Sequence, residues 1–391
     1  MFSKTANHFR GETNPLYQER DALLERGESP IDLVSGNVHL HGIHYPQPIF
    51  EKALRDAADD ARIYRPHPLG QQVAREAVSR YYREAGVFIP REQIVLTPGT
   101  SLSYWYAFKL FAEPGDEILS PRPTYSLFDS IAALAGIHLN HYRLSESSRW
   151  ILDLDDLESK ITTKTRAIIL ISPHNPTGAV ATQEEIEGLA AIATRHHLPI
   201  ISDEVFSPFL FRGDRLPRPA ATAAPLVITL NGLSKMLALP GAKIGWMAIT
   251  GEPSLVKKSI DALETISDTF LPVNEAAQFA VPALLTEGKS FLASYQLEIR
   301  KRCETAVAIL SRAPRLSFHK PEGGFYIAVR INDPNIDEEA FALALLRRHH
   351  ILVHPGFFYD LEPSHFVVSF VSDVAILEST LGKLIGSLDP H

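Results

Sequence analysis

Residues 231–246 read Asn-Gly-Leu-Ser-Lys-Met-Leu-Ala-Leu-Pro-Gly-Ala-Lys-Ile-Gly-Trp, and this stretch carries the strongest signal in the chain. It lies between two apolar runs, residues 226–230 and 244–250, that are typical of buried strands. Lys235 therefore follows a predicted strand, in a loop with Pro240 and three glycines. Burial disfavours the ammonium form, so a lysine there can act as a nucleophile and form a Schiff base with a carbonyl. A lone lysine in a turn is more often an ordinary surface residue, so other segments must support this interpretation.

Length and composition indicate a globular protein of ordinary make-up. The 391 residues are 45% hydrophobic and 21% charged, and the chain is long enough for two domains. A formal net charge of −8 argues against broad nucleic-acid binding, which needs a basic face. The single cysteine, Cys303, excludes an intramolecular disulfide and a cysteine-rich metal site.

The sequence also gives expectations about location and metals. No run of about 18 apolar residues occurs, and the first residues lack the apolar centre of a signal peptide. We therefore expect a cytoplasmic protein without a membrane span. Sixteen histidines are present, but none forms a His-x3-His pair with a glutamate base, so no metal site is predicted.

The order of apolar and amphipathic segments predicts an α/β fold. Strand-like runs occur at residues 94–97, 117–120, 167–172, 199–202, 226–230 and 244–250, with helical stretches such as 102–111 and 182–195 between them. This alternation is typical of a mainly parallel sheet covered by helices on both faces. We expect residues 46–285 to form a large α/β domain. A smaller α+β domain should combine residues 1–45 with 286–391.

Four polar segments follow these runs, at the place where parallel sheets bind ligands. The first, residues 97–101, opens a helix, and the backbone N–H groups of Gly99, Thr100 and Ser101 could bind an anion there. This signal is weak alone, because many strand-to-helix turns look alike. No Gly-x-Gly-x-x-Gly motif is present, and Glu287-Gly-Lys-Ser290 lacks the leading glycine of a P-loop.

The other three segments each present one polar or aromatic side chain. Tyr125 could stack on a planar ring or simply pack in the core. Asn175, in His-Asn-Pro-Thr-Gly, could donate an amide N–H to a phenolate oxygen or form a plain turn. Asp203 is predicted to be buried, where a carboxylate needs a cationic partner, although it could also cap a helix.

Taken in order, Gly99, Tyr125, Asn175, Asp203 and Lys235 resemble the site of the fold-type-I pyridoxal-phosphate (PLP) aminotransferases of class I/II. The pattern Ser-Lys-x4-Pro-Gly-x-Lys-x-Gly is similar to their cofactor-lysine signature, and residues 321–326 are similar to a small-domain strand. The resemblance implies that Lys235 forms the Schiff base with PLP and then moves protons as acid and base. It implies that Asp203 holds the pyridine nitrogen, Asn175 the 3′-oxygen and Tyr125 the ring face.

The resemblance also assigns the phosphate and substrate contacts. The phosphate is expected to meet Gly99, Thr100, Ser101, Ser234, Lys243 and, from a partner subunit, Tyr64. A homodimer is therefore implied. Gly36 and Asn37, with Asn175, are expected to border the substrate.

Four positions depart from the family pattern. Phe206 replaces a tyrosine, Gly232 replaces a Ser or Thr, and Lys243 replaces an arginine, so charge is kept but the bidentate fork is lost. Val367 stands where an arginine normally binds the substrate α-carboxylate. Other anchors are then required, and the candidates are Asn37, Asn175, Arg65 and, more weakly, Arg330.

We therefore expect a PLP-dependent transaminase of the EC 2.6.1 class, moving an amino group between an amino acid or amine and a 2-oxo acid. The main alternative is a PLP-dependent lyase, cyclase or oxidase of a specialised pathway on the same fold. A PLP-binding regulator without catalysis ranks last. No nucleic-acid or membrane partner is expected.

Overall fold

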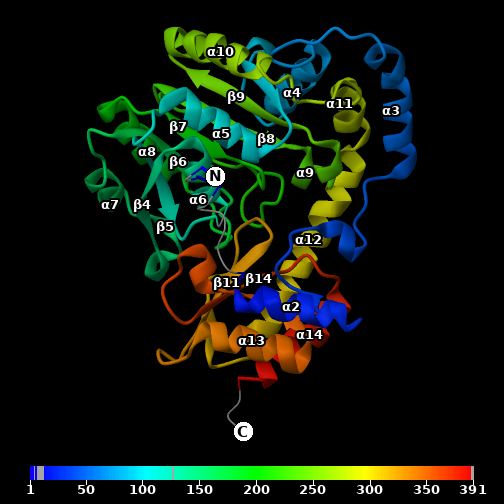
Figure 1. The fold of residues 1–391 in the computed structure, drawn as a ribbon, viewed down its shortest axis with the longest axis vertical. Helices are drawn as coiled ribbons and strands as arrows, with labels where there is room; N and C mark the ends of the chain where they lie inside the picture. The colour runs from blue at the N-terminus through cyan, green and yellow to red at the C-terminus, as the bar shows by residue number, and fades with distance from the viewer. Residues whose placement is uncertain (4, 7–12, 126, 389–391) are drawn as a thin grey trace.

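The computed structural model describes residues 1–3, 5–6, 13–125 and 127–388. Its described part contains an eight-stranded sheet, a four-stranded sheet and a two-stranded parallel pair, with helices packed around them (Figure 1). The large sheet lies in the upper half of Figure 1 and the four-stranded sheet in the lower half.

The large sheet has the strand order β2-β9-β8-β7-β6-β3-β4-β5. Strands β8, β7, β6, β3 and β4 run parallel, whereas β9 is antiparallel to both β8 and β2, and β5 is antiparallel to β4. The predicted mainly parallel sheet is thus confirmed. The bounds are β2 Ile94–Thr97, β3 Glu117–Arg122, β4 His138–Ser145, β5 Ile151–Leu152, β6 Thr165–Ile171, β7 Ile200–Asp203, β8 Leu226–Gly232 and β9 Gly245–Gly251.

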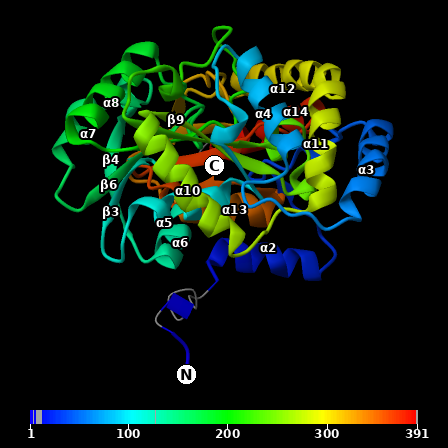
Figure 2. The same cartoon turned by 90° about the horizontal axis from the view of Figure 1, so that it is seen from above.

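Both faces of this sheet are apolar, because alternate residues of a strand point to opposite faces. In β6, Ile168 and Leu170 belong to one core cluster, and Ile169 and Ile171 belong to another. Helix α8 lies in the first cluster, and α5, α6 and α10 lie in the second, on the other side of the sheet (Figure 2). The bounds are α5 Thr100–Phe111, α6 Phe128–Ala135, α7 Leu154–Ser159, α8 Gln183–His196 and α10 Pro253–Asp268.

Strand β4 was missed by the sequence analysis. Its residues, His-Leu-Asn-His-Tyr-Arg-Leu-Ser, do not form a continuous apolar run. Only Tyr142 and Leu144 of this strand are buried. A half-exposed strand near a sheet edge needs few apolar residues, so its sequence resembles that of a loop.

The four-stranded sheet is antiparallel and has the order β10-β11-β14-β13. Its apolar residues share a core with α12, α13 and α14, and α2 packs against α13. Next to it, β1 pairs in parallel with β12. The bounds are α2 Pro15–Glu25, β1 Ile31–Asp32, α12 Lys289–Leu310, β10 Leu316–Phe318, β11 Tyr326–Ile331, α13 Glu338–His349, β12 Ile351–Leu352, β13 His354–Pro355, β14 His365–Ser369 and α14 Val374–Gly386.

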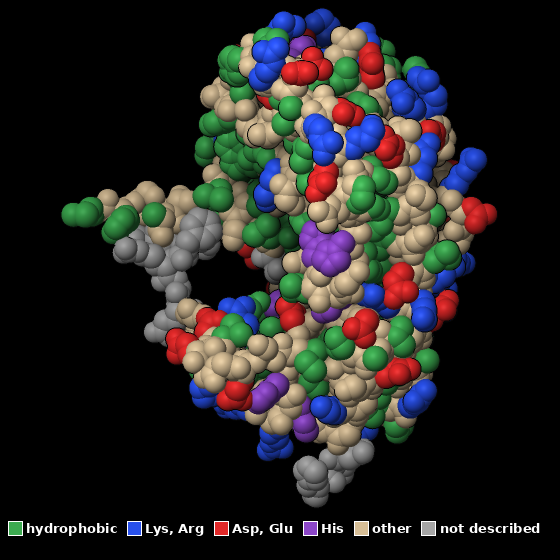
Figure 3. All heavy atoms as spheres, turned by 90° about the vertical axis from the view of Figure 1, so that its right-hand side faces the viewer, with side chains coloured by type: hydrophobic (Ala, Val, Ile, Leu, Met, Phe, Trp, Pro, Cys, Tyr) green, Lys and Arg blue, Asp and Glu red, His purple; other side chains and the backbone are tan. Residues whose placement is uncertain are grey.

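Helices α3 Gln47–Ala61 and α4 Gln72–Glu84 pack against α11 Glu275–Glu287 at the β2 side of the large sheet. On the face drawn in Figure 3, acidic and basic side chains of the described residues are interspersed. No helix in the described part of the chain is both long and apolar enough to span a membrane.

Candidate active site

Lys235 lies on α9 Leu233–Met236, a short helix that begins as β8 ends. Its amino group donates a hydrogen bond to the carbonyl oxygen of Gly36, 3.2 Å away. A side chain added at Gly36 would begin 2.7 Å from Tyr326 Oη and 3.1 Å from Lys235 Nζ. The lysine amine, the Gly36 turn and the Tyr326 hydroxyl therefore converge, and glycine is required for this approach.

Burial lowers the pKa of Lys235 from its ordinary value to about 8. Removing the ammonium from water disfavours its charged form, and no carboxylate among the described residues offsets that cost. A useful fraction of the amine is therefore neutral near neutral pH, as a nucleophile requires.

This pKa predicts how cofactor-free protein should recombine with PLP. Only the neutral amine attacks the cofactor aldehyde, so the rate should rise about tenfold per pH unit at low pH and level off above about pH 8. Stopped-flow absorbance measures this rate, with Nα-acetyl-lysine as a reference for titration of the cofactor itself. A midpoint near the ordinary lysine pKa would show that the amine is not desolvated.

Asp203 is the last residue of β7, the neighbour of β8 in the sheet. Its carboxylate accepts hydrogen bonds from Tyr104 Oη at 2.7 Å and from the Val205 N–H at 2.9 Å. Burial raises the pKa of Asp203 to about 6, because these two hydrogen bonds only partly offset the desolvation. The adjacent Glu204 pairs with buried Arg218, so that cation is already engaged.

In the part of the chain that the structure describes, Asp203 has no cationic partner. A buried carboxylate without a counter-ion is costly. This is the environment that a protonated pyridine nitrogen would complete, so the residue fits the role that the sequence assigned to it.

The start of α5 forms an anion cradle. Gly99 has φ of +151°, and a side chain added there would meet nothing within 4 Å. The N–H groups of Thr100 and Ser101 have no acceptor among the described residues. Free N–H groups at a helix N-terminus attract a phosphate.

Close backbone packing behind this cradle explains one departure from the family pattern. A side chain at Gly245 would begin 2.9 Å from the Gly99 Cα, and one at Gly232 would begin 2.7 Å from the Ile244 oxygen. A Ser or Thr at position 232 would therefore displace the backbone that supports the cradle.

Asn175 and Tyr125 follow β6 and β3. The Oδ1 atom of Asn175 is buried and has no hydrogen-bond partner within the described ranges. Tyr125 packs edge-on against Phe128 at 5.6 Å. Burial raises the pKa of Tyr125, and the negative charge of nearby Asp203 adds to this effect. Tyr125 thus lies near Asp203, as a residue that covers a flat cofactor would, and the orphaned Asn175 atom is a hydrogen-bond acceptor.

Four other predicted residues are exposed or partly exposed in this structure. Tyr64 is 76% exposed and Lys243 is exposed, with positive φ. Asn37 is exposed, and its side chain accepts from His39 N–H. Ser234 is partly exposed on α9, one residue before Lys235. None of these is hydrogen-bonded to Asp203 or Lys235 in the structure.

The sequence analysis missed Tyr104 and Tyr326. Tyr104 lies in the first turns of α5 and donates to Asp203, and Tyr326 reaches Gly36 from β11. The only available signals were the helix that opens at Gly99 and the Pro-Glu-Gly-Gly-Phe-Tyr segment, and neither assigns a partner to a tyrosine.

The structure also locates Phe206 and Val367, two further departures. Phe206 packs on Phe325 at 4.9 Å and presents no hydroxyl to the site. Val367 is 1% exposed in β14, between Ala328 of β11 and His354 of β13. Of the arginines considered as replacements, Arg330 is paired with Glu146 and Arg65 is exposed.

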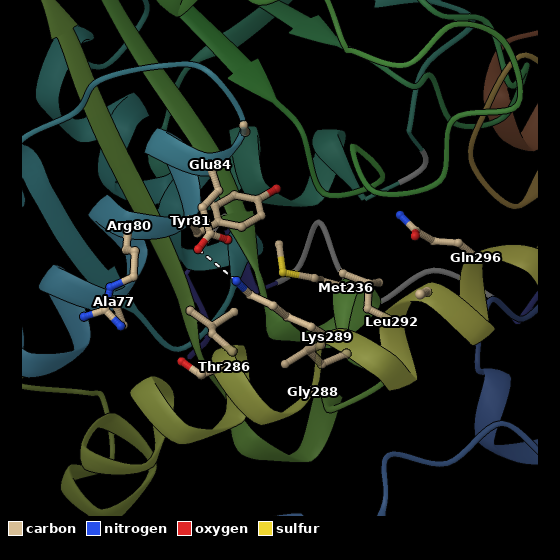
Figure 4. A pocket seen from close by; sticks show the side chains of 14 residues that line it. Ala77, Arg80, Tyr81, Glu84, Met236, Thr286, Gly288, Lys289, Leu292 and Gln296 are labelled. Carbon is tan, nitrogen blue, oxygen red and sulfur yellow. Dashed lines mark hydrogen bonds and ion pairs between the residues drawn. The ribbon is translucent and has the colours of Figure 1, made fainter.

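A separate cavity of about 260 Å³ lies between α4, the end of α9, and the junction of α11 with α12 (Figure 4). Met236 and Leu237 form part of its wall, and the Lys289–Glu84 ion pair of 2.8 Å crosses it between α12 and α4. Lys235 and Asp203 are not among the described residues that line it. We place the candidate site at the strand ends, because the desolvated Lys235 amine, the Asp203 carboxylate without a cation and the free N–H groups at the start of α5 lie there.

Comparisons with known proteins agree with this geometry. The family model for aminotransferase class I and II matches residues 28–380. The chain belongs to this family. It is 30% identical to a glutamate-pyruvate aminotransferase of Haemophilus influenzae, over 96% of this chain and 95% of that protein. An alanine aminotransferase of Mycobacterium tuberculosis is also 30% identical, with 95% of this chain and 89% of that protein covered.

Solved structures show the same fold. An alanine aminotransferase from Pyrococcus furiosus has a TM-score of 0.92 at 28% identity, covering 99% of this chain and all of that one. The class I and II aminotransferases depend on PLP, so this chain is a PLP-dependent transaminase of fold type I. The predicted family, fold and cofactor are confirmed. Its substrates are amino acids and oxo acids in the general sense of the family.

Proposed function

We propose that this aminotransferase acts on small donors and 2-oxo acids, with Lys235 as its catalytic residue and Asp203 as the partner of the cofactor nitrogen. One observation carries the proposal: Lys235, whose pKa is lowered to about 8, follows β8, and the neighbouring strand β7 ends in a buried carboxylate that has no cationic partner among the described residues. The relatives named glutamate-pyruvate and alanine aminotransferase support small substrates.

Each residue has a distinct task in this proposal. Bound PLP supplies an electron sink for the bonds at the substrate α-carbon. Lys235, neutral in part near neutral pH, takes and returns the α-proton. Asp203 would keep a proton at the pyridine nitrogen, and Tyr104 holds Asp203 in place. Asn175 would donate to the 3′-oxygen, and Tyr125 would cover the ring.

The phosphate would lie at the α5 N-terminus. The N–H groups of Thr100 and Ser101 after Gly99 would bind it, with Ser234 and Lys243 adding a hydroxyl and a positive charge. The Gly36–Asn37 turn and Asn175 would border the substrate, because Gly36 contacts the Lys235 amine.

A screen of purified holoenzyme against amine and oxo-acid pairs tests the function. Mass spectrometry should detect the aminated acceptor and the deaminated donor in equal amounts. Ammonia, or a product formed without an acceptor, would favour the lyase, cyclase or oxidase.

Aspartate and 2-oxoglutarate should be poor substrates. Both depend on arginine contacts, and a charged hydrogen-bonded pair contributes about 1.5–3 kcal/mol, so its loss should raise KM roughly 10- to 100-fold. Half-reaction kinetics with aspartate, followed by bleaching of the cofactor absorbance, measure this loss. Efficient bleaching by aspartate at ordinary concentrations would show that the valine at position 367 does not matter.

We also propose a homodimer with shared active sites. Tyr64 is 76% exposed on the loop that precedes α4, as a residue that reaches a partner subunit would be in an isolated chain. Sedimentation velocity should give a dimer, and Tyr64→Phe should weaken PLP binding several-fold. A monomer with full activity and bound cofactor would rule this out.

A further inference from the structure

Three charged side chains join the two larger sheets at a place outside the active site. Glu146 begins the 3₁₀ helix Glu146–Ser148, which follows β4 of the eight-stranded sheet. Arg330 of β11 and His365 of β14 belong to the four-stranded sheet and pair directly with each other in its register. Arg330 donates two hydrogen bonds to the Glu146 carboxylate, and His365 Nε2 lies 3.0 Å from the same carboxylate. The proposed reaction does not use these contacts.

The contacts of His365 require that its ring carries two protons. Its side chain is fully buried, and its Nδ1 lies 2.7 Å from the Glu362 carbonyl oxygen. Burial would raise the pKa of Glu146, but the hydrogen bonds and charges of His365 and Arg330 outweigh it and lower this pKa to about 2. Glu146 is therefore ionised at neutral pH. A carbonyl oxygen and an ionised carboxylate can only accept, so both ring nitrogens of His365 are donors and the ring is positively charged.

Carboxyl groups from three elements surround this cation. Glu146 faces its Nε2, and Glu338 of α13 accepts a hydrogen bond from the His365 backbone N–H at 2.9 Å. Glu362, three residues before His365, acts through its negative charge on Arg330. The positive charge of His365 therefore offsets part of the negative charge that these carboxylates bring together.

Loss of one ring proton would turn an attraction into a repulsion. Nδ1 would keep its hydrogen, because the Glu362 carbonyl oxygen requires a donor. The lone pair of Nε2 would then face the Glu146 carboxylate with no hydrogen between them, and a buried contact of this kind is costly. Arg330 would still bind Glu146, so the junction would be weakened and not abolished. The junction is thus strongest while His365 is protonated, and it loosens as the pH rises.

Open space beside the junction gives solvent access to it. A cavity of about 550 Å³ lies between β4 and residues 360–362, and Glu146 and Trp150 are among its lining residues. The ring of Trp150 lies 6.3 Å from that of His365, so the histidine is close to this cavity. Glu146 is 26% exposed. Water can therefore reach the carboxylate and exchange protons with the group.

The pairing of β11 with β14 connects this junction to the active site. Arg330 and His365 form the pair at one end of the ladder. Tyr326 and Ser369 form the pair at its other end, about 13 Å along the strand. The Tyr326 hydroxyl lies near the Lys235 amine, on the other side of the glycine turn at position 36. Paired strands of this length move together, so a shift at Arg330 is carried to Tyr326.

We propose that Glu146, Arg330 and His365 form a pH-dependent latch between the two sheets. The latch is closed while His365 carries both ring protons, and it opens as rising pH removes one of them. Opening lets the end of β11 that carries Tyr326 move relative to Lys235. This device belongs to the fold and does not depend on the substrate, so it goes beyond the proposed function.

Amide hydrogen exchange of the holoenzyme tests the latch, because activity would also change with the charge of Lys235. The reporter is the peptide that contains Thr124, whose N–H donates to the Tyr359 oxygen at 2.8 Å and so joins the two sheets. Glu146→Gln and His365→Gln each remove one charge and keep a polar side chain. The rates are corrected for the pH dependence of exchange in an unfolded peptide.

At about pH 6, below the ordinary histidine pKa of roughly 6.5, each variant should exchange the Thr124 amide roughly tenfold faster than the wild type. Tenfold is the lower end for a charged hydrogen bond, because Glu146 and Arg330 are partly exposed. By about pH 9 the wild type has lost the His365 proton as well. The ratio of variant to wild-type rates should then fall below about twofold.

His196→Gln is the matched control. His196 Nε2 lies 2.8 Å from Glu158, but these residues lie on α8 and α7, so their contact does not join the two sheets. This variant should match the wild type at both pH values. Equal exchange of Thr124 in the wild type and Glu146→Gln at about pH 6, or a tenfold ratio that persists at about pH 9, would overturn the inference. Glu146→Gln decides the outcome alone if the buried His365→Gln variant does not fold.

Discussion

Replacing Lys235 with Ala should lower turnover by about 10⁴-fold or more, because the variant loses both its nucleophile and its acid–base group. The buried amine donates to the Gly36 oxygen, and no other lysine of the described residues hydrogen-bonds to Gly36 or Asp203. Steady-state assays with the best donor from the screen measure the loss. The fold should persist, since the truncation removes one hydrogen bond.

Lys257→Ala is the matched control. Lys257 is exposed on α10 and pairs with Asp261 at 2.7 Å, so its loss should leave turnover unchanged. Retention of more than a small fraction of activity by the Lys235→Ala variant, with its circular dichroism spectrum intact, would show that another group performs the proton transfer.

Asp203→Asn should slow α-proton removal by roughly 10²- to 10³-fold, or about 3–4 kcal/mol, because the neutral amide cannot hold a proton at the cofactor nitrogen. The change is nearly isosteric and keeps an acceptor for Tyr104. Single-turnover kinetics with α-deuterated donor isolate this step, since an isotope effect should appear or increase in the variant.

Tyr104→Phe separates charge from position at the same place. It removes one hydrogen bond to Asp203 but leaves the carboxylate, so the rate should fall by about tenfold, well short of the effect of Asp203→Asn. A near-wild-type rate for Asp203→Asn would show that the cofactor nitrogen has a different partner.

The sequence analysis predicted those site residues that can be inferred from the residues next to them in the chain. Asp203 is the last residue of β7 and Lys235 lies three residues after β8, and parallel strands bring their carboxyl ends to one edge of a sheet. Gly99 has a comparable signal, because a glycine between a strand and a helix start indicates an anion cradle. Such positions can be inferred without knowledge of tertiary contacts.

Residues that act through distant contacts could not be inferred in this way. The hydrogen bond between Tyr104 and Asp203 joins residues 99 positions apart in the sequence, and the one between Tyr17 and His354 joins residues 337 positions apart. From the sequence alone, a tyrosine in a helix can be assigned to the core or to the surface, but its hydrogen-bond partner cannot be inferred. The absence of an arginine at position 367 was visible in the sequence, but its neighbours Ala328 and His354 depend on the pairing of β14 with β11 and β13.

Several expectations remain predictions. The division into residues 46–285 and residues 1–45 with 286–391 awaits limited proteolysis, and cytoplasmic location awaits fractionation. The roles of Tyr64 and Lys243 depend on a partner subunit and a bound phosphate.

The most direct test is borohydride reduction of the purified, yellow holoenzyme, followed by peptide mapping. We predict that reduction removes the visible absorbance and fixes one cofactor per chain to Lys235, within the peptide that contains Ser234 and Met236. A cofactor fixed to any other lysine, or none fixed at all, would contradict the assignment of the active site.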